Sequence, residues 1–120
     1  MTEFHAQVRI DGAMAVIDLA GTIDSQAESA LDAAYRDCGP GREGAVALDF
    51  TKVDYINSTG IALLVSLLAK ARRDGRPVVA WGLTDHYREI FEITRLADFL
   101  EVVTDEQAAR AAAGTTTGEE

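Results

Sequence analysis

Residues 49–75 read DFTKVDYINSTGIALLVSLLAKARRDG and contain the pattern that decides the fold. An apolar run ends, a short polar stretch follows, and a long amphipathic pattern begins, which predicts a strand end, a loop and a helix. Three small polar residues, Asn57, Ser58 and Thr59, precede Gly60 and the most apolar run in the chain. We therefore expect the functional site at the turn between this strand and this helix.

The start of this helix fits two capping arrangements. If Ser58 is the N-cap, its hydroxyl accepts a hydrogen bond from a backbone N–H of the first turn and has a structural role. If Asn57 is the N-cap, Ile56 and Ile61 occupy the two positions of a hydrophobic staple, and the Ser58 hydroxyl is free. We favour the second arrangement. At the other end of the helix, Gly75 is the expected C-terminal stop.

Two strands and a helix are predicted before this segment. Residues 4–10 alternate apolar and polar side chains, as in a strand with one solvated face, and residues 14–20 form a second strand after an Asp11-Gly12 turn. These strands should form an antiparallel hairpin with the first strand at the sheet edge. A capping-box pattern that begins at Ser25 starts the first helix, and a Gly-Pro-Gly sequence ends it.

The remaining predicted elements alternate between strands and helices. They are a strand at residues 44–50, the central helix, a strand at residues 78–81, a helix that begins at Thr84 and Asp85, a short strand within residues 96–103, and a helix that begins at Thr104. This alternation implies parallel strands joined by helical crossovers. We expect an α/β fold in which a small mixed sheet of about five strands packs with about four helices. Residues 1–113 should form one domain and residues 114–120 a disordered tail.

The partner-binding rim is predicted from this topology. Parallel strands place their C-terminal ends on one rim of the sheet, and open α/β sheets have their binding sites there. The helices that follow these strands begin on the same rim. The candidate partner-binding residues are therefore Asp24, Ser25, Asn57, Ser58, Thr59, Gly60, Thr84 and Asp85.

The charge balance limits the classes of partner. The 120 residues include 20 acidic and 11 basic side chains, a net charge of −9. This disfavours nucleic acid, whose phosphates are held by clustered Lys and Arg, and favours a basic protein surface. The single cysteine, Cys38, cannot form an internal disulfide, and no apolar run reaches the roughly 18 residues of a membrane span. We expect a cytoplasmic protein without a cofactor or a metal.

Residues 49–64, DFTKVDYINSTGIALL, resemble the signature of STAS-domain proteins of the anti-sigma factor antagonist type. In that signature a strand leads to Asp-Ser-Ser-Gly or Asp-Ser-Thr-Gly and an apolar helix. Residues 21–24 (GTID) and 90–96 (IFEITRL) are similar to two further segments of the same family. The resemblance implies a single STAS-like domain that regulates sigma-factor-dependent transcription by switching partners.

The family resemblance also implies a role for Ser58 as the residue that is phosphorylated. The kinase would be an anti-sigma factor with serine kinase activity. This anti-sigma factor would bind the unphosphorylated protein and would be released when the serine is phosphorylated. A metal-dependent serine phosphatase would then remove the phosphate. Thr59 is the second candidate acceptor. Asn57 replaces the usual aspartate of the motif. An asparagine caps a helix about as well as an aspartate does, but it carries no charge. The fold is therefore expected to be retained even if the kinase does not phosphorylate Ser58.

Two other classes of function are considered. An enzyme with Ser58 as its nucleophile would need a base, but the G-x-S-x-G pattern is absent and the two histidines, His5 and His86, are not suitably placed. We therefore predict no enzyme and no catalytic or metal-binding residues. The alternative is a free-standing STAS module that senses a small ligand or binds a partner without phosphorylation.

Overall fold

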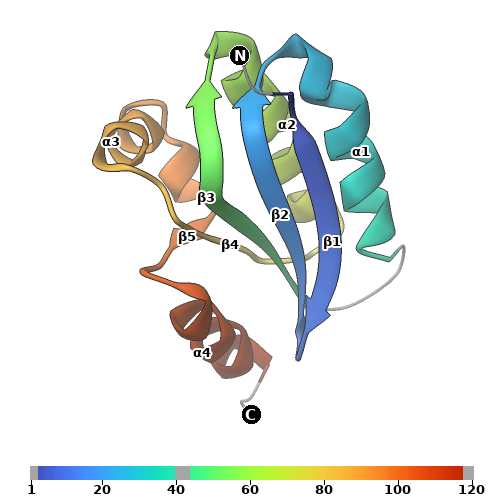
Figure 1. Cartoon of the computed structure of the whole chain (residues 1–120). Coiled ribbons are helices and arrows are strands. Elements are labelled where there is room, and N and C mark those ends of the chain that lie inside the picture. The colour runs from blue at the N-terminus through green and yellow to red at the C-terminus, as the bar shows by residue number, and fades with distance from the viewer. Residues whose placement is uncertain (1–2, 40–43, 118–120) are drawn as a thin grey trace.

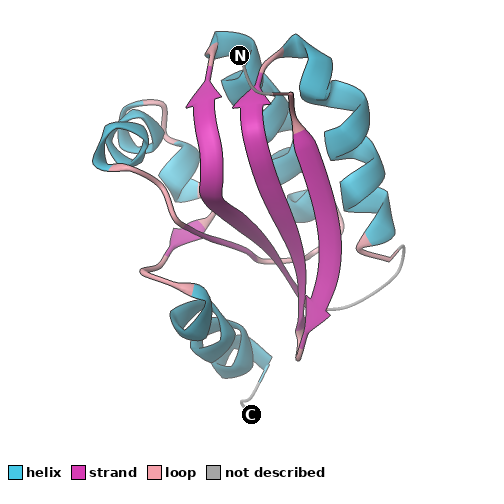
Figure 2. Ribbon diagram, viewed as in Figure 1, coloured by secondary structure: helices cyan, strands magenta, loops and turns pink. Residues whose placement is uncertain are grey.

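Five strands form one mixed sheet in the order β1-β2-β3-β4-β5 (Figures 1 and 2). The computed structural model describes residues 3–39 and 44–117. In it β1 pairs antiparallel with β2, and every other neighbouring pair is parallel. This confirms the predicted α/β fold with an antiparallel strand at the edge. The strands are β1 (His5–Asp11), β2 (Met14–Ile23), β3 (Ala45–Ile56), β4 (Val78–Trp81) and β5 (Glu101–Val102).

Helices cover both faces of the sheet. Within the described part of the chain the helices are α1 (Glu28–Asp37), α2 (Ser58–Arg73), α3 (Asp85–Ile93) and α4 (Glu106–Thr117), with single 3-10 turns at η1 (Ser25–Ala27) and η2 (Leu96–Asp98). Residues of α1, α2 and α3 belong to the larger hydrophobic core, and α4 packs on a smaller cluster. In Figure 1, α2 lies behind the sheet and α1 lies beside β1.

The side chains of β2 alternate between the two hydrophobic clusters, as the pleat of a strand requires. Ile17 and Leu19 point into the larger core. Met14 and Val16 point to the other face, where they pack in the cluster that includes Ala109 of α4. The middle of the sheet is therefore buried on both faces, which explains the nearly continuous apolar run at the start of β3.

Strands β2 and β3 extend further than the sequence pattern predicts. β3 continues beyond residue 50 to Ile56, and β2 continues beyond residue 20 to Ile23, so the two strands end side by side. The extension of β3 is hard to recognise because residues 51–55 (TKVDY) carry mostly exposed polar side chains. The loop predicted before α2 is therefore strand, and only Asn57 separates β3 from α2.

Two helix starts use a different cap from the predicted one. Asp24, not Ser25, caps η1, and its carboxylate accepts a hydrogen bond from the backbone N–H two residues later (2.9 Å). At α4, the carboxylate of Asp105, next to Thr104, accepts a hydrogen bond from the backbone N–H three residues later (2.8 Å). Aspartate caps a helix about as well as serine, so the sequence could not decide between adjacent candidates.

Gly75 ends α2 as predicted. It has φ = +71° and follows the last helical turn. Its N–H donates to the carbonyl of Arg72 (3.1 Å), and the N–H of Arg76 donates to the carbonyl of Ala71 (2.9 Å). These two bonds form a Schellman motif, in which a left-handed residue is needed and glycine adopts that conformation without strain.

The C-terminal helix is longer than the sequence indicates. α4 continues to Thr117, so residues 114–117 are helical where a tail was predicted, and residues 118–120 lie outside the described residues. The alanines before Gly114 are strong helix formers, and the polar residues after it give only a weak stop signal. The predicted Gly-Pro-Gly stop of α1 falls partly on residues 40–43, which also lie outside the described residues. The domain boundary at residue 113 stays a prediction.

Charged side chains attach α4 to the first two strands. The guanidinium of Arg9 on β1 donates to Asp18 of β2 (Nε to Oδ2, 2.6 Å) and to Glu106 of α4 (Nη1 to Oε2, 2.6 Å). The hydrogen bond from Arg9 lowers the pKa of Glu106 to about 2. A second ion pair joins Arg110 of α4 to Asp11 at the end of β1 (2.8 Å). The position of α4 therefore depends on ionised carboxylates.

Candidate functional site

Asn57 is the N-cap of α2, which confirms the second capping arrangement. Its backbone is extended (φ −92°, ψ −177°), and its Oδ1 accepts a hydrogen bond from the N–H of Gly60 (2.8 Å). Its carbonyl accepts the first helical hydrogen bond, from Ile61 (2.9 Å). Ser58 is therefore the first helical residue; it is exposed, and its hydroxyl makes no hydrogen bond to another described residue. The next residue, Thr59, is also exposed.

Gly60 allows α2 to start against the end of β2. A Cβ atom at this position would lie 2.1 Å from the carbonyl oxygen of Ile23, well inside van der Waals contact. The same carbonyl accepts a hydrogen bond from the N–H of Asn57 (3.2 Å). Gly60 is buried, and this close packing within the chain accounts for the glycine. Its assignment to the partner-binding rim stays a prediction.

Tyr87 connects α3 to the end of β3. Its hydroxyl accepts a hydrogen bond from the N–H of Ile56 (2.9 Å) and donates to the carbonyl of the same residue (3.5 Å). Tyr87 is only 8% exposed, so both bonds are shielded from water. This contact fixes the strand end that precedes Asn57 and Ser58. Sequence reasoning missed Tyr87, because nothing in the pattern around it indicates a partner 31 residues away.

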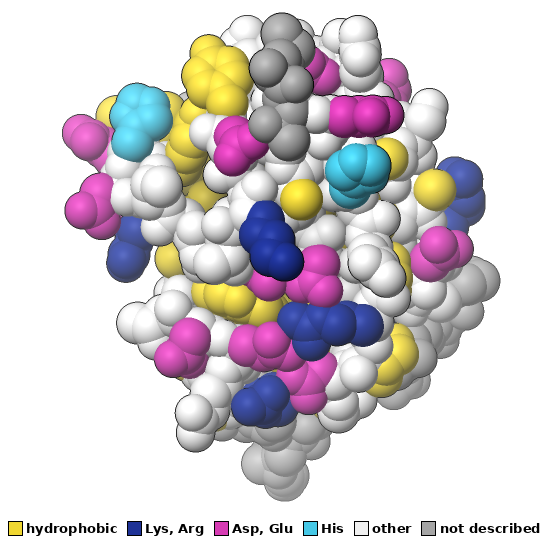
Figure 3. All heavy atoms as spheres, in the orientation of Figure 1, with side chains coloured by type: hydrophobic (Ala, Val, Ile, Leu, Met, Phe, Trp, Pro, Cys, Tyr) yellow, Lys and Arg dark blue, Asp and Glu magenta, His cyan; other side chains and the backbone are white. Residues whose placement is uncertain are grey.

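A groove lies between the start of α2 and α3, directly beside Ser58. Its volume is about 380 Å³, and it is lined from β3 and α2 by Tyr55, Ser58 and Ile61 and from α3 by His86, Ile90 and Thr94. Tyr55 is 55% exposed, and Ile93, near the end of α3, is 71% exposed. Hydrophobic side chains are visible in this region at the upper left of Figure 3. Apart from Ser58, sequence reasoning did not assign these residues to a site.

The predicted rim residues fall into two groups. Asp24 and Ser25 lie at η1, directly after β2. Since β2 and β3 end side by side, η1 contacts α2, which follows β3. Thr84 and Asp85 begin α3 further down the side of β3, because β4 already ends at Trp81, opposite the first half of β3. Thr84 caps α3 as predicted, and neither Thr84 nor Asp85 lines the groove. The predicted rim residues therefore lie at two levels. α3 contributes to the groove from its first turn, with His86, through Ile90 to its C-cap, Thr94.

Among the residues that the structure describes, no three His, Cys, Asp or Glu side chains gather in a group that could hold a metal ion. None of the helices in residues 3–39 and 44–117 has the length and apolar character needed to cross a bilayer.

Comparisons with known proteins identify the family of this chain. A family described as "Mlab, STAS domain" matches residues 6–104. The chain belongs to this STAS domain family. BtrV of Bordetella bronchiseptica, named as a candidate anti-sigma factor antagonist, is 31% identical over 104 residues, which is 87% of this chain and 89% of BtrV.

Other similar proteins include a Listeria anti-sigma-B factor antagonist and the solved structures of SpoIIAA. The anti-sigma-B factor antagonist of Listeria monocytogenes is 37% identical over 62 residues, 51% of this chain, and the match spans about half (54%) of the Listeria protein. The solved structure of the anti-sigma factor antagonist SpoIIAA in its unphosphorylated form has a TM-score of 0.66 at 15% identity and covers 93% of this chain and 99% of SpoIIAA. Phosphorylated SpoIIAA of Bacillus has a TM-score of 0.63 at 17% identity and covers 92% and 99%. At these identities the likeness to SpoIIAA shows the STAS fold alone.

Proposed function

We propose that this STAS protein is an anti-sigma factor antagonist that docks its partner on the groove beside Ser58 and is switched by phosphorylation of that serine. The observation that carries the proposal is an exposed serine at the first position of α2, on the wall of an apolar groove. This serine does not cap the helix, because Asn57 does. The names of the Listeria and Bordetella relatives support the class of partner. The protein would act by binding and would not be an enzyme.

A phosphate on Ser58 is compatible with the fold. The Asn57 side chain already accepts the N–H of Gly60, so the cap does not use the serine. The first turn of a helix has free N–H groups and a positive dipole end, which favour a phosphate by about 0.3 to 1 kcal/mol. Asn57 is neutral, so it adds no repulsion to the phosphate. The phosphorylated chain should therefore keep its structure.

The same phosphate should prevent docking. It adds about −1.5 to −2 charges and a bulky group at the wall of a groove whose other lining is largely apolar. A partner surface that fits the unmodified groove would have to desolvate this charge, which is costly in an apolar contact. Release of the partner then follows from the bulk of the phosphate and the cost of desolvating it, and needs no change of fold.

The surroundings of the groove favour a basic partner surface. The strand and helix that form its walls carry exposed carboxylates at Asp54 on β3 and at Asp85, Glu89 and Glu92 on α3. The exposed basic residues on the same two elements are fewer, Lys52 and Arg88. Complementary charge would steer a basic anti-sigma factor towards the groove. The proposed partners are thus an anti-sigma factor with serine kinase activity and a metal-dependent serine phosphatase that removes the phosphate, both meeting the protein in the cytoplasm.

The test is phosphorylation and binding with the anti-sigma kinases of the protein's own source. Intact and peptide mass spectrometry after incubation with ATP should show one added phosphate on Ser58, and none in Ser58→Ala. Ser58→Asp should weaken binding of the anti-sigma factor in calorimetry by at least tenfold, whereas Ser66→Asp, an exposed serine on the same helix, should change it little. A phosphate on Thr59 instead would support the same phosphorylation switch, with Thr59 as the modified residue.

Other outcomes would overturn the proposal. If a kinase binds the protein but modifies neither Ser58 nor Thr59, the phosphorylation switch is wrong. If Ser58→Ala melts far below the wild-type protein, the serine has a structural role.

The alternative is a STAS module that senses a small ligand. It is favoured by the size of the groove, about 380 Å³, which falls within the range of about 300 to 1,000 Å³ found for small-molecule sites. Native mass spectrometry of the purified protein distinguishes the two functions. A retained ligand that is lost on substituting Ile61→Ser in the groove would support the alternative.

A further inference from the structure

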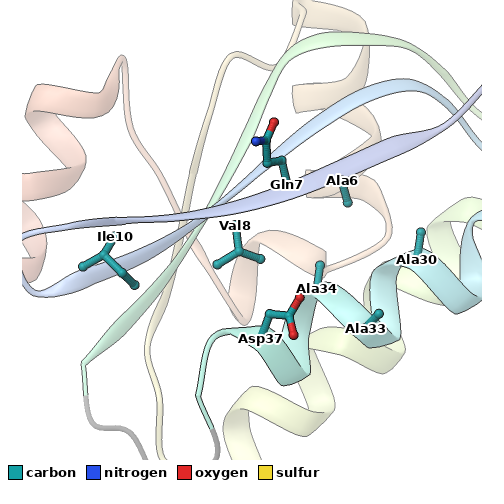
Figure 4. A pocket seen from close by; sticks show the side chains of 8 residues that line it. All are labelled: Ala6, Gln7, Val8, Ile10, Ala30, Ala33, Ala34 and Asp37. Atoms are coloured by element: carbon teal, nitrogen blue, oxygen red, sulfur yellow. The ribbon is translucent and has the colours of Figure 1, made fainter.

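A second groove lies at the β1 edge of the sheet, between β1 and α1 (Figure 4). Its volume is about 590 Å³, and its apolar lining comes from Ala6, Val8 and Ile10 of β1 and from Ala30, Ala33 and Ala34 of α1. Figure 4 shows the three β1 side chains pointing towards α1, while Gln7 points to the opposite face. Ile10 is 53% exposed, so it adds apolar surface to this groove.

The backbone beside this groove has no neighbouring strand within the described residues. β1 pairs only with β2, and the Asp11–Met14 pair closes the hairpin turn. Because hydrogen-bonded and non-hydrogen-bonded pairs alternate along an antiparallel ladder, every second residue of β1 directs its N–H and C=O away from β2. Counting back from Asp11, these residues are Ala6, Val8 and Ile10. The open backbone groups therefore belong to the residues whose side chains line the groove.

We propose that this edge pairs with the β1 edge of a second copy of the chain. The two strands would run antiparallel about a two-fold axis through Val8, joining two five-stranded sheets into one. In this register Val8 faces Val8 of the other copy, and Ala6 faces Ile10. All the open backbone groups of the strand then find partners, and Ile10 is covered.

The polar face of β1 supports a second copy as the occupant. In the same register His5 lies opposite Asp11, and Gln7 lies opposite Arg9, so no charge faces a like charge across the new pair. Like charges directly opposite each other would destabilise a sheet. A shift of the register by two residues in either direction would leave part of the seven-residue strand unpaired. One symmetric register is therefore preferred.

The helix beside the edge also permits this approach. From α1 the groove is lined by alanines at positions 30, 33 and 34, about one helical turn apart, and by Asp37 in the last turn of the helix. Small side chains leave room for α1 of the second copy next to the extended sheet. The groove beside Ser58 stays open in this dimer, since α3 and β1 lie on opposite sides of the molecule (Figure 1). Dimerisation and partner binding are thus separable.

The first test is the mass of the protein in solution, measured by sedimentation over a range of concentrations. The wild-type mass should double as the concentration rises. Ile10→Lys places a charge in the interface at an exposed position, so it should remain monomeric and folded. Ile93→Lys makes the same change on the exposed end of α3 and should dimerise like the wild type. A wild type that stays monomeric up to its solubility limit, or a dimer that survives Ile10→Lys, would overturn the proposal.

The second test reports the register. Paired residues that exchange hydrogen bonds have Cα atoms about 5.5 Å apart, within the range for a disulfide. Val8→Cys should therefore cross-link to itself in the presence of oxidised glutathione. Ile10→Cys should not, because its two copies would lie four residues apart along the strand, roughly 13 Å. Equal cross-linking of the two variants would show that the proposed register is wrong.

Discussion

The start of α2 and the attachment of α4 are held in different ways. At the start of α2, the Asn57 cap, the close approach of Gly60 and the Tyr87 hydroxyl involve only neutral groups. At α4, the contacts to the first two strands include ion pairs made by Arg9 and Arg110. Neutral hydrogen bonds and packing are hardly affected by salt or moderate pH, whereas partly exposed ion pairs are screened and titrated. The candidate site should therefore keep its shape under conditions that loosen α4.

The largest effect is expected for Gly60→Ala. The added Cβ would clash with the carbonyl of Ile23, and since the obstacle is backbone, α2 must shift. We expect a loss of about 3 kcal/mol in the free energy of unfolding, despite the better helix propensity of alanine. Urea denaturation measures the loss, and Thr59→Ala, an exposed neighbour, should change stability by less than about 1 kcal/mol. A Gly60→Ala protein as stable as the wild type would contradict the close packing of α2 on β2.

A smaller loss is expected for Tyr87→Phe. This change removes the hydroxyl and leaves the buried N–H of Ile56 without its partner. Such an unsatisfied group costs about 1 to 3 kcal/mol. Thermal denaturation should show the loss for Tyr87→Phe and almost none for Tyr55→Phe, the same chemical change on an exposed ring. Equal stability of the two variants would mean that the Tyr87 hydroxyl does not hold the end of β3.

The smallest effect is expected for Glu106→Gln, at the α4 attachment. The bond from Arg9 lowers the pKa of Glu106 from 4.5 to about 2. The ion pair therefore stabilises the fold above pH 4.5, and this contribution is lost as the pH falls towards 2. We expect the substitution to cost at most about 1 kcal/mol at pH 7, because the pair is partly exposed, and to flatten the pH dependence of stability in this window.

Its control is Glu101→Gln, the same loss of charge at an exposed position on β5. Hydrogen exchange should be faster in α4 of the Glu106→Gln protein and unchanged around Ser58. Faster exchange at the start of α2 would show that the two regions are not independent.

The features that the sequence predicted correctly are local. The Asn57 cap and the Gly75 stop of α2 each depend on a few neighbouring residues whose side-chain chemistry or lack of a Cβ determines the backbone. The order of strands and helices follows from hydrophobic periodicity, which each segment carries in its own residues. Where two adjacent residues could serve, as Asp24 and Ser25 could, the sequence was ambiguous and the prediction was wrong.

The features that it missed depend on contacts between distant segments. Residues 51–55 are strand because they pair with the end of β2, although their own side chains are largely polar and exposed. The groove beside Ser58 has one wall from β3 and α2 and the other from α3. No pattern within either segment indicates that Tyr87 meets Ile56. Long-range pairing of this kind is determined by the whole fold, so local patterns cannot reveal it.

The double hydrogen bond between Tyr87 and Ile56 has a kinetic consequence for any partner of the groove. It fixes both walls before a partner arrives, so binding requires little ordering of this chain. Association should then proceed at the usual rate for rigid docking, about 10⁵ to 10⁷ M⁻¹ s⁻¹. Differences between partners should therefore appear mainly in how long the complex lasts.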